Sequence, residues 1–154
     1  MSKQKLIYIS GKMGENVLSE ATVKKFEVAQ NKLLNDGWAV INPASPVFQR
    51  DAQKHVKIEE KKWQQIEYGE FDWYAWLLLW DMHLLALCDA IYMLSDWQDS
   101  PGATSEYYYA QACGKEIIME KLRSGKPTTA IAVIDKQIFS PFGITEKTAK
   151  RKRG

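Results

Sequence analysis

The sequence predicts an α/β protein in which a mostly parallel sheet of about five strands is covered by helices on both faces. Short apolar runs alternate along the chain with segments of helical periodicity, as they do in a parallel sheet with crossover helices. A chain of 154 residues is also long enough to bury the core of one such domain.

The first half of the chain begins with a strand, a helix and a second strand. Residues 5–10 are apolar and are followed by a glycine-containing loop. Apolar residues between Ser19 and Leu34 have helical spacing, and Gly37 is placed to end that helix. The strand predicted at 38–42 stops at Pro43.

The segment that follows has no clear hydrophobic periodicity, whereas the segments after residue 70 are clearly periodic. Residues 47–70 are polar, and we expect an irregular loop there with a short helix near residues 55–66. The elements predicted after it are an apolar helix at 72–87, a strand at 89–94, a loop at 95–102, a helix at 103–113 and a strand at 116–119.

The C-terminal part of the chain leaves alternatives open. Residues 130–134 have the composition of a fifth strand, and the apolar residues within 138–144 suit a docking segment or a partner contact. We expect one domain over residues 1–145 and a basic, disordered tail over residues 146–154.

Composition and charge narrow the function classes. The net charge is only +2 and much of the excess lies in the tail, so nucleic acid is not an expected partner. No signal peptide is recognised, and Cys88 and Cys113 lie in apolar segments without metal-ligand spacing, so we expect a cytoplasmic protein with buried thiols and no bound metal. Residues 73–88 are apolar, but they are too few to span a membrane and they include Asp81.

Two carboxylates stand out as candidates for chemistry. Glu106 follows a strand and a glycine-containing loop, at the edge of a parallel sheet where ligands bind. The structural alternative is a first-turn glutamate stabilised by the helix dipole. Asp81 lies in a helix that is apolar on every side, where a carboxylate is costly unless it is paired or functional.

Other residues near these loops are candidates for binding or for local structure. Ser100 and Gly102 precede a helix N-terminus, which can bind anions, and Gly11 and Lys12 form a second loop of this kind. Neither loop has a dinucleotide or P-loop motif. Trp97 lies in the candidate site loop, whereas Asp89 begins a strand and is interpreted as structural.

Taken together, these residues resemble the nucleoside 2-deoxyribosyltransferase superfamily, and most closely its DUF4406 branch. The resemblance covers roughly residues 5–120 and rests on Tyr8 to Gly11, Gly37 to Ala44, Cys88 to Leu94, Trp97, Ser100 to Ala103, Glu106, and Asp81 eight residues before Asp89. It implies a flavodoxin-like or Rossmann-like three-layer fold.

The resemblance also implies an enzyme that cleaves or transfers the N-glycosidic bond of a 2′-deoxynucleoside or its 5′-monophosphate without a cofactor. It makes Glu106 the nucleophile at the anomeric carbon, Asp81 the group that handles the proton of the base, and Tyr8 the residue that orients the nucleophile. The family further implies a homo-oligomer. The alternative is a non-catalytic nucleotide-binding module of the same fold.

One departure from the family pattern bears on the substrate. The transferases carry an aspartate six residues before the glutamate, where this chain has Ser100. The related 5′-monophosphate N-glycosidases have a serine there that binds phosphate, which favours a monophosphate substrate and hydrolysis. Their glycine-and-arginine loop is not reproduced by residues 11–14, although Lys12 supplies one positive charge.

Overall fold

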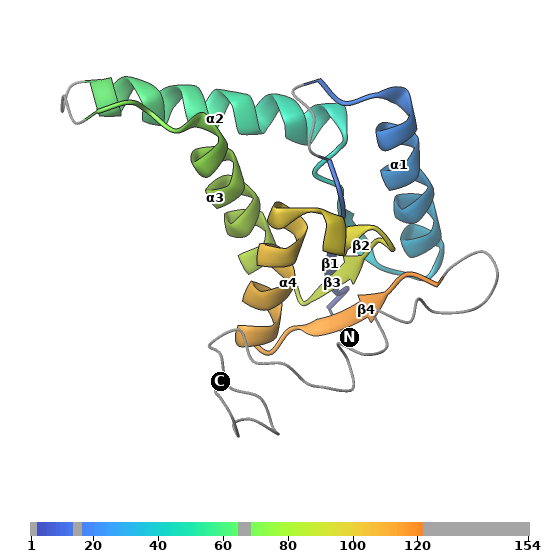
Figure 1. Cartoon of the computed structure of the whole chain (residues 1–154). Coiled ribbons are helices and arrows are strands. Elements are labelled where there is room, and N and C mark those ends of the chain that lie inside the picture. The colour runs from blue at the N-terminus through green and yellow to red at the C-terminus, as the bar shows by residue number, and fades with distance from the viewer. Residues whose placement is uncertain (1–2, 14–16, 65–68, 122–154) are drawn as a thin grey trace.

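The computed structural model describes residues 3–13, 17–64 and 69–121, and it has the expected α/β class (Figure 1). Within these residues the sheet has four strands, all parallel, in the order β2-β1-β3-β4. The strands are β1 (Leu6–Ser10), β2 (Ala39–Ile41), β3 (Ala90–Met93) and β4 (Glu116–Met119). The candidate fifth strand at 130–134, the apolar segment 138–144 and the tail 146–154 lie outside the described residues.

Four α-helices accompany the strands: α1 (Glu20–Asn35), α2 (Pro46–Gln64), α3 (Trp73–Ala86) and α4 (Pro101–Ala112). Figure 1 shows α1 on one side of the sheet and α3 and α4 on the other. The core is accordingly divided into two apolar clusters, one between the sheet and α1 and one between the sheet, α3 and α4. A three-layer fold of the flavodoxin or Rossmann type is therefore confirmed, with a slightly smaller sheet than expected.

Strand β1 lies inside the sheet and contributes side chains to both apolar clusters. Its side chains alternate between the two faces, as they must in any strand. Ile7 and Ile9 pack in the α1 cluster, and Tyr8 packs in the cluster under α3 and α4. Ser10 follows the same alternation and reaches α4, so β1 offers two hydroxyl groups to that face of the sheet.

Local signals define the ends of the helices. The Ser19 hydroxyl accepts a hydrogen bond from the Thr22 N–H at the start of α1, and Gly37 follows the helix with a φ of 99°. At the start of α3, the Asp72 carboxylate accepts a hydrogen bond from the Ala75 N–H. These boundaries lie within a few residues of the predicted ones.

The largest correction concerns α2. The sequence suggested an irregular loop with a short helix at 55–66, but the structure has a helix of 19 residues that begins at Pro46. Proline fits the first turn of a helix, because its missing N–H would have no intrahelical partner there. Ala52 and Val56 alone are buried in α2, so its apolar face is narrow and its packing against α3 supplies the stability that the pattern does not reveal.

Smaller differences from the predictions are found at the start of α4 and at Cys113. Helix α4 begins at Pro101, two residues before its predicted start, with Ser100 as its cap. Cys88 is buried as expected, but Cys113 is exposed because it follows the end of α4. Among the described helices, none combines the length and the apolar character needed to cross a bilayer.

The topology creates a crevice beside β1. The chain leaves β1 toward α1 on one face of the sheet and leaves β3 toward α4 on the other face. The carboxyl ends of β1 and β3 therefore flank the point where the strand order reverses, which is where open α/β sheets bind their ligands.

Candidate active site

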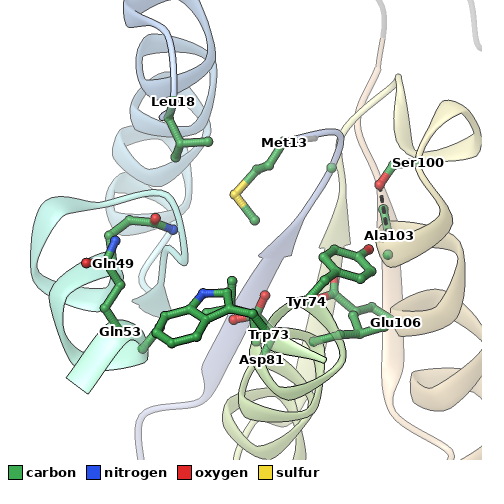
Figure 2. Close-up of a pocket in the computed structure, with 15 residues that line it drawn as sticks. Met13, Leu18, Gln49, Gln53, Trp73, Tyr74, Asp81, Ser100, Ala103 and Glu106 are labelled. Carbon is green, nitrogen blue, oxygen red and sulfur yellow. Dashed lines mark hydrogen bonds between the residues drawn. The ribbon is translucent and has the colours of Figure 1, made fainter. Parts of the chain in front are cut away.

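A pocket of about 470 Å³ opens at this edge of the sheet, which is a volume suited to a small organic ligand. Its wall combines the loop after β1 with residues of α2, α3 and the first turns of α4 (Figure 2). Figure 2 shows Gln49 and Gln53 of α2 on one side of the pocket and Glu106 of α4 on the other, with Trp73 and Asp81 of α3 between them. The two carboxylates singled out from the sequence thus lie in one cavity.

Glu106 is held from below by the two hydroxyl groups of β1. Its side chain is buried, with 4% of the residue exposed. The Tyr8 hydroxyl donates to Oε2 at 2.8 Å and the Ser10 hydroxyl donates to Oε1 at 2.6 Å. Each oxygen therefore accepts one hydrogen bond, which fixes the orientation of the carboxyl group and stabilises its charged form.

The proton affinity of Glu106 reflects two opposing effects. Burial raises the pKa of its carboxyl group to about 7, even though the hydrogen bonds from Ser10 and Tyr8 lower it. Burial, together with the charges of Asp81 and Glu106, raises the pKa of Tyr8 well above its ordinary value. Tyr8 therefore remains a hydrogen-bond donor throughout the neutral pH range.

Asp81 has a different environment. It is partly buried in the wall formed by α3, and no hydrogen bond to its carboxylate is found within residues 3–13, 17–64 and 69–121. Burial and the charge of Glu106 both raise the pKa of Asp81 well above its ordinary value. Among the described residues, Glu106 has hydrogen-bond donors that stabilise its charge and Asp81 has none, which favours Asp81 as the holder of a proton shared by this pair.

The start of α4 contributes neutral donors to the pocket. The Ser100 hydroxyl accepts the Ala103 N–H at 3.1 Å and so caps the helix. Its own hydrogen is free to point elsewhere. A Cβ added to Gly102 would lie 3.1 Å from the Tyr74 hydroxyl, so the absence of a side chain keeps this corner open.

Of the other residues predicted to bind a ligand, Gly11 lines the pocket, whereas Lys12 and Trp97 do not. Gly11 lines the pocket, but packing also requires a glycine there, because a Cβ would lie 2.6 Å from Cδ1 of the buried Leu94. Lys12 is exposed and does not line the pocket, and its backbone N–H donates to Asp96 at 3.0 Å. Trp97 is also outside the pocket. It is 1% exposed and stacks on Tyr107 in the core.

Asp89 has the structural role expected for it. Its carboxylate accepts the Leu6 N–H at 2.8 Å, at the amino end of the strands and therefore at the opposite edge of the sheet from the pocket. This hydrogen bond links the first residue of β1 to the residue that precedes β3.

Several residues that line the pocket or contact Glu106 were missed from the sequence. Ser10 could have been found, because the alternation along β1 places it on the same face as Tyr8. Gln49 and Gln53 were hidden by the incorrect prediction for α2, which gave them no helix face to share. Trp73 belongs to the strongly apolar segment 73–88, where nothing in the sequence distinguishes it from a core residue.

Metal binding has no visible basis in the described part of the chain. No group of three or more histidine, cysteine, aspartate or glutamate side chains is arranged to hold an ion there. What the pocket offers is a pair of carboxyl groups in unlike environments.

Comparison with protein families adds one finding. Residues 5–119 match the family model DUF4406, which is described as a domain of unknown function. The comparison with curated proteins finds no match.

Proposed function

This chain belongs to the DUF4406 family, and we propose from its pocket that it cleaves or transfers the N-glycosidic bond of a 2′-deoxynucleoside or its 5′-monophosphate. One observation carries the proposal. Glu106, anchored by Tyr8 and Ser10, faces the same cavity as Asp81, which is the better proton carrier of the two. Two carboxyl groups with separated roles are the machinery that glycosidic bond cleavage requires. The likeness to the deoxyribosyltransferases in the residues around Tyr8, Asp81 and Glu106 supports the same assignment.

The first half of the proposed reaction forms a covalent sugar–enzyme ester. A Glu106 oxygen attacks C1′ of the deoxyribose as the bond from C1′ to the base nitrogen breaks. The electron pair of that bond goes to the base, and the Asp81 proton neutralises it. The base then leaves as a neutral molecule, with Asp81 ionised.

The second half returns the enzyme to its starting state. Water, in hydrolysis, or the nitrogen of a second base, in transfer, attacks C1′ and releases Glu106 as a carboxylate. Asp81 accepts the proton that the incoming group loses. The hydrogen bonds from Tyr8 and Ser10 hold Glu106 in position through both steps.

The charge of the pocket favours an uncharged nucleoside over its monophosphate. No lysine or arginine is found among the described residues that line it, and two carboxyl groups are present. The role of Ser100 as a phosphate contact remains a prediction. Its hydroxyl is partly committed to capping α4, and the described pocket residues include no cation to balance a phosphate dianion.

Release of free base tests the proposal directly. The protein is incubated with a panel of deoxynucleosides and their monophosphates, and the base is measured by chromatography. We expect wild-type release and a loss of at least about 1000-fold in Glu106→Gln, because the amide cannot act as the nucleophile. Glu116→Gln changes an exposed carboxylate on β4 and serves as the matched control.

The same experiment separates the enzyme from the non-catalytic alternative. If neither wild type nor Glu106→Gln releases base while a nucleoside raises the melting temperature of both, the pocket binds without turnover and the catalytic proposal fails.

We also propose that the chain forms a homo-oligomer through the outer face of α3. This helix is apolar on all sides, and the side turned away from Asp81 carries Ala75, Leu79 and Ala86, all exposed. Leu79 alone is 56% exposed. Light scattering coupled to size exclusion should show an oligomer that Leu79→Glu dissociates, and a monomeric wild type at tens of micromolar would contradict this proposal.

A further inference from the structure

Helix α2 carries a row of four cations on one exposed face. The spacing of four, three and four residues places them along the same side of the helix, over about 16 Å. The members of this basic row are Arg50, Lys54, Lys57 and Lys61, and all four are exposed. At 100° per residue, Asp51 and Glu60 lie about 90° to either side of the row, and Glu59 lies on the opposite face of the helix.

The cations of the basic row have no carboxylate partners in the described part of the chain. Some lysines outside the row are paired: Lys24, Lys32 and Lys62 reach a carboxylate oxygen at 3.3, 2.8 and 3.5 Å, respectively. A face of a helix with four unneutralised positive charges creates a local positive potential that attracts anions.

The basic row lies next to the pocket. Gln49 and Gln53, which line the pocket, immediately precede Arg50 and Lys54 and are therefore about 100° away on the same helix. Figure 2 shows these two glutamines forming the α2 wall. Positive charge is thus missing from the described pocket lining and concentrated just beside it.

This distribution suits a ligand whose buried part is neutral and whose outer part carries several negative charges. We propose that the basic row binds the phosphodiester backbone of single-stranded DNA, and that the pocket receives one nucleoside of that strand. A single strand is favoured over a duplex because its bases are free to enter a pocket. The second half of this proposal rests on the proposed function, and the first half does not.

Aromatic side chains at the pocket support a nucleic-acid ligand over an acidic protein. Tyr74 lines the pocket and is 58% exposed, and Trp73 lines it from the same turn of α3. Rings placed beside a row of cations are typical of single-strand binding, since bases stack on the rings while the cations follow the backbone. A polyglutamate chain has no aromatic groups that could stack on these rings.

Fluorescence anisotropy with a labelled single-stranded oligodeoxynucleotide and the full chain tests the binding step. Four phosphate contacts contribute a slope of about −3 to log K against log salt, which is about a 50-fold loss of affinity between 50 and 200 mM. Replacing all four cations of the basic row by glutamine should remove that contribution and weaken binding more than 10-fold at 100 mM salt.

Two control variants locate the binding surface. Glutamine at Lys3, Lys5, Lys24 and Lys32 lowers the net charge by the same amount elsewhere on the molecule, and we expect less than a threefold change. Glutamine at the tail cations Lys147, Lys150, Arg151, Lys152 and Arg153 should leave the effect of the basic row intact. The proposal is overturned if either control abolishes binding while the basic-row variant binds normally, or if polyglutamate or anionic vesicles compete as well as DNA.

The two halves of the proposal, and the proposed function, fail in different ways. Glu106→Gln should bind the oligonucleotide like wild type, so binding is measured without turnover. The basic-row variant should release base from free deoxynucleosides at the wild-type rate and from the oligonucleotide at least 10 times more slowly. Equal rates on the oligonucleotide would refute delivery of a strand to the pocket while leaving the nucleoside reaction in place.

Discussion

Two sides of the pocket each carry a carboxyl group, but in different environments. The floor, where α4 packs on β1, carries Glu106, and the wall formed by α3 carries Asp81. On the floor, Glu106 of α4 is buried, with 4% of the residue exposed, and each of its oxygens accepts a hydrogen bond from β1. On the wall, Asp81 of α3 is partly exposed to the cavity and has no hydrogen-bond donor in the described part of the chain. Burial raises the pKa of both, but only the floor supplies donors that oppose the rise.

Under the proposed function, this difference in environment would assign the role of nucleophile to Glu106 and the role of acid to Asp81. The donors, and not the residue type, decide which group gives up its proton first. Removing the nucleophile, the acid or one of the donors should therefore produce distinct effects.

After the loss of Glu106, the largest effect on catalysis is expected when the acid on the wall is removed. Asp81→Asn should slow base release from ordinary deoxynucleosides by about 100-fold to 10,000-fold, because the base must then leave unprotonated. With 7-methyl-2′-deoxyguanosine, whose base already carries a positive charge, the loss should be below about 10-fold. Equal losses on both substrates would show that Asp81 does not act as the acid.

The second effect concerns stability and pH. Because the folded state raises the pKa of Glu106 from 4.5 to about 7, it retains a proton that the unfolded chain has released between these values. Wild-type stability should therefore be unaffected by this group below pH 4.5, fall as the pH rises, and reach a cost of about 3 kcal/mol above pH 7.

Glu106→Gln cannot ionise and should escape that cost. Urea denaturation should find the variant more stable than wild type by up to about 3 kcal/mol at pH 8, with the difference disappearing near pH 4. A difference that is constant with pH would mean that Glu106 is not held with a raised pKa.

A smaller effect should follow from the loss of one donor on the floor. Tyr8→Phe removes a hydrogen bond that lowers the pKa of Glu106, so the acidic limb of the kcat/KM profile should move to higher pH. The rate at pH 7 should fall about 10-fold. Tyr92→Phe removes a tyrosine hydroxyl on the opposite face of the sheet and should leave the profile in place.

The smallest effect is expected at the other edge of the sheet. Asp89→Ala removes an acceptor for the Leu6 N–H and should cost about 1 kcal/mol in the free energy of unfolding, with no change in base release. Asp89→Asn keeps an acceptor oxygen and should recover most of that stability. A lower catalytic rate in Asp89→Ala at full folding would place this carboxylate in the reaction after all.

Much of the fold could be predicted because its signals are local. The strands are short apolar runs, α1 has a serine cap and a terminal glycine, and α3 is strongly apolar throughout. Helix α2 has a cap, since the Ser45 hydroxyl accepts the Phe48 N–H at 3.4 Å just before Pro46, but its apolar face is narrow and it depends on packing against α3. The error there had a consequence, because Arg50, Lys54, Lys57 and Lys61 form a row only if the helix is continuous.

The sequence by itself determined the α/β class, the order of the elements and the position of Glu106 after a strand and a loop, since these depend on hydrophobic periodicity and capping. It also identified Asp81 as unusual, because a carboxylate is rare in an apolar helix. Only the tertiary structure showed that Ser10 joins Tyr8 in donating to Glu106, and that Asp81 lies in the same cavity as Glu106. It also placed Trp97 in the core and Lys12 outside the pocket. The physical reason is that burial and hydrogen bonding depend on contacts in three dimensions between residues as far apart in the chain as those of β1 and α4. The same contacts set the pKa of each carboxyl group.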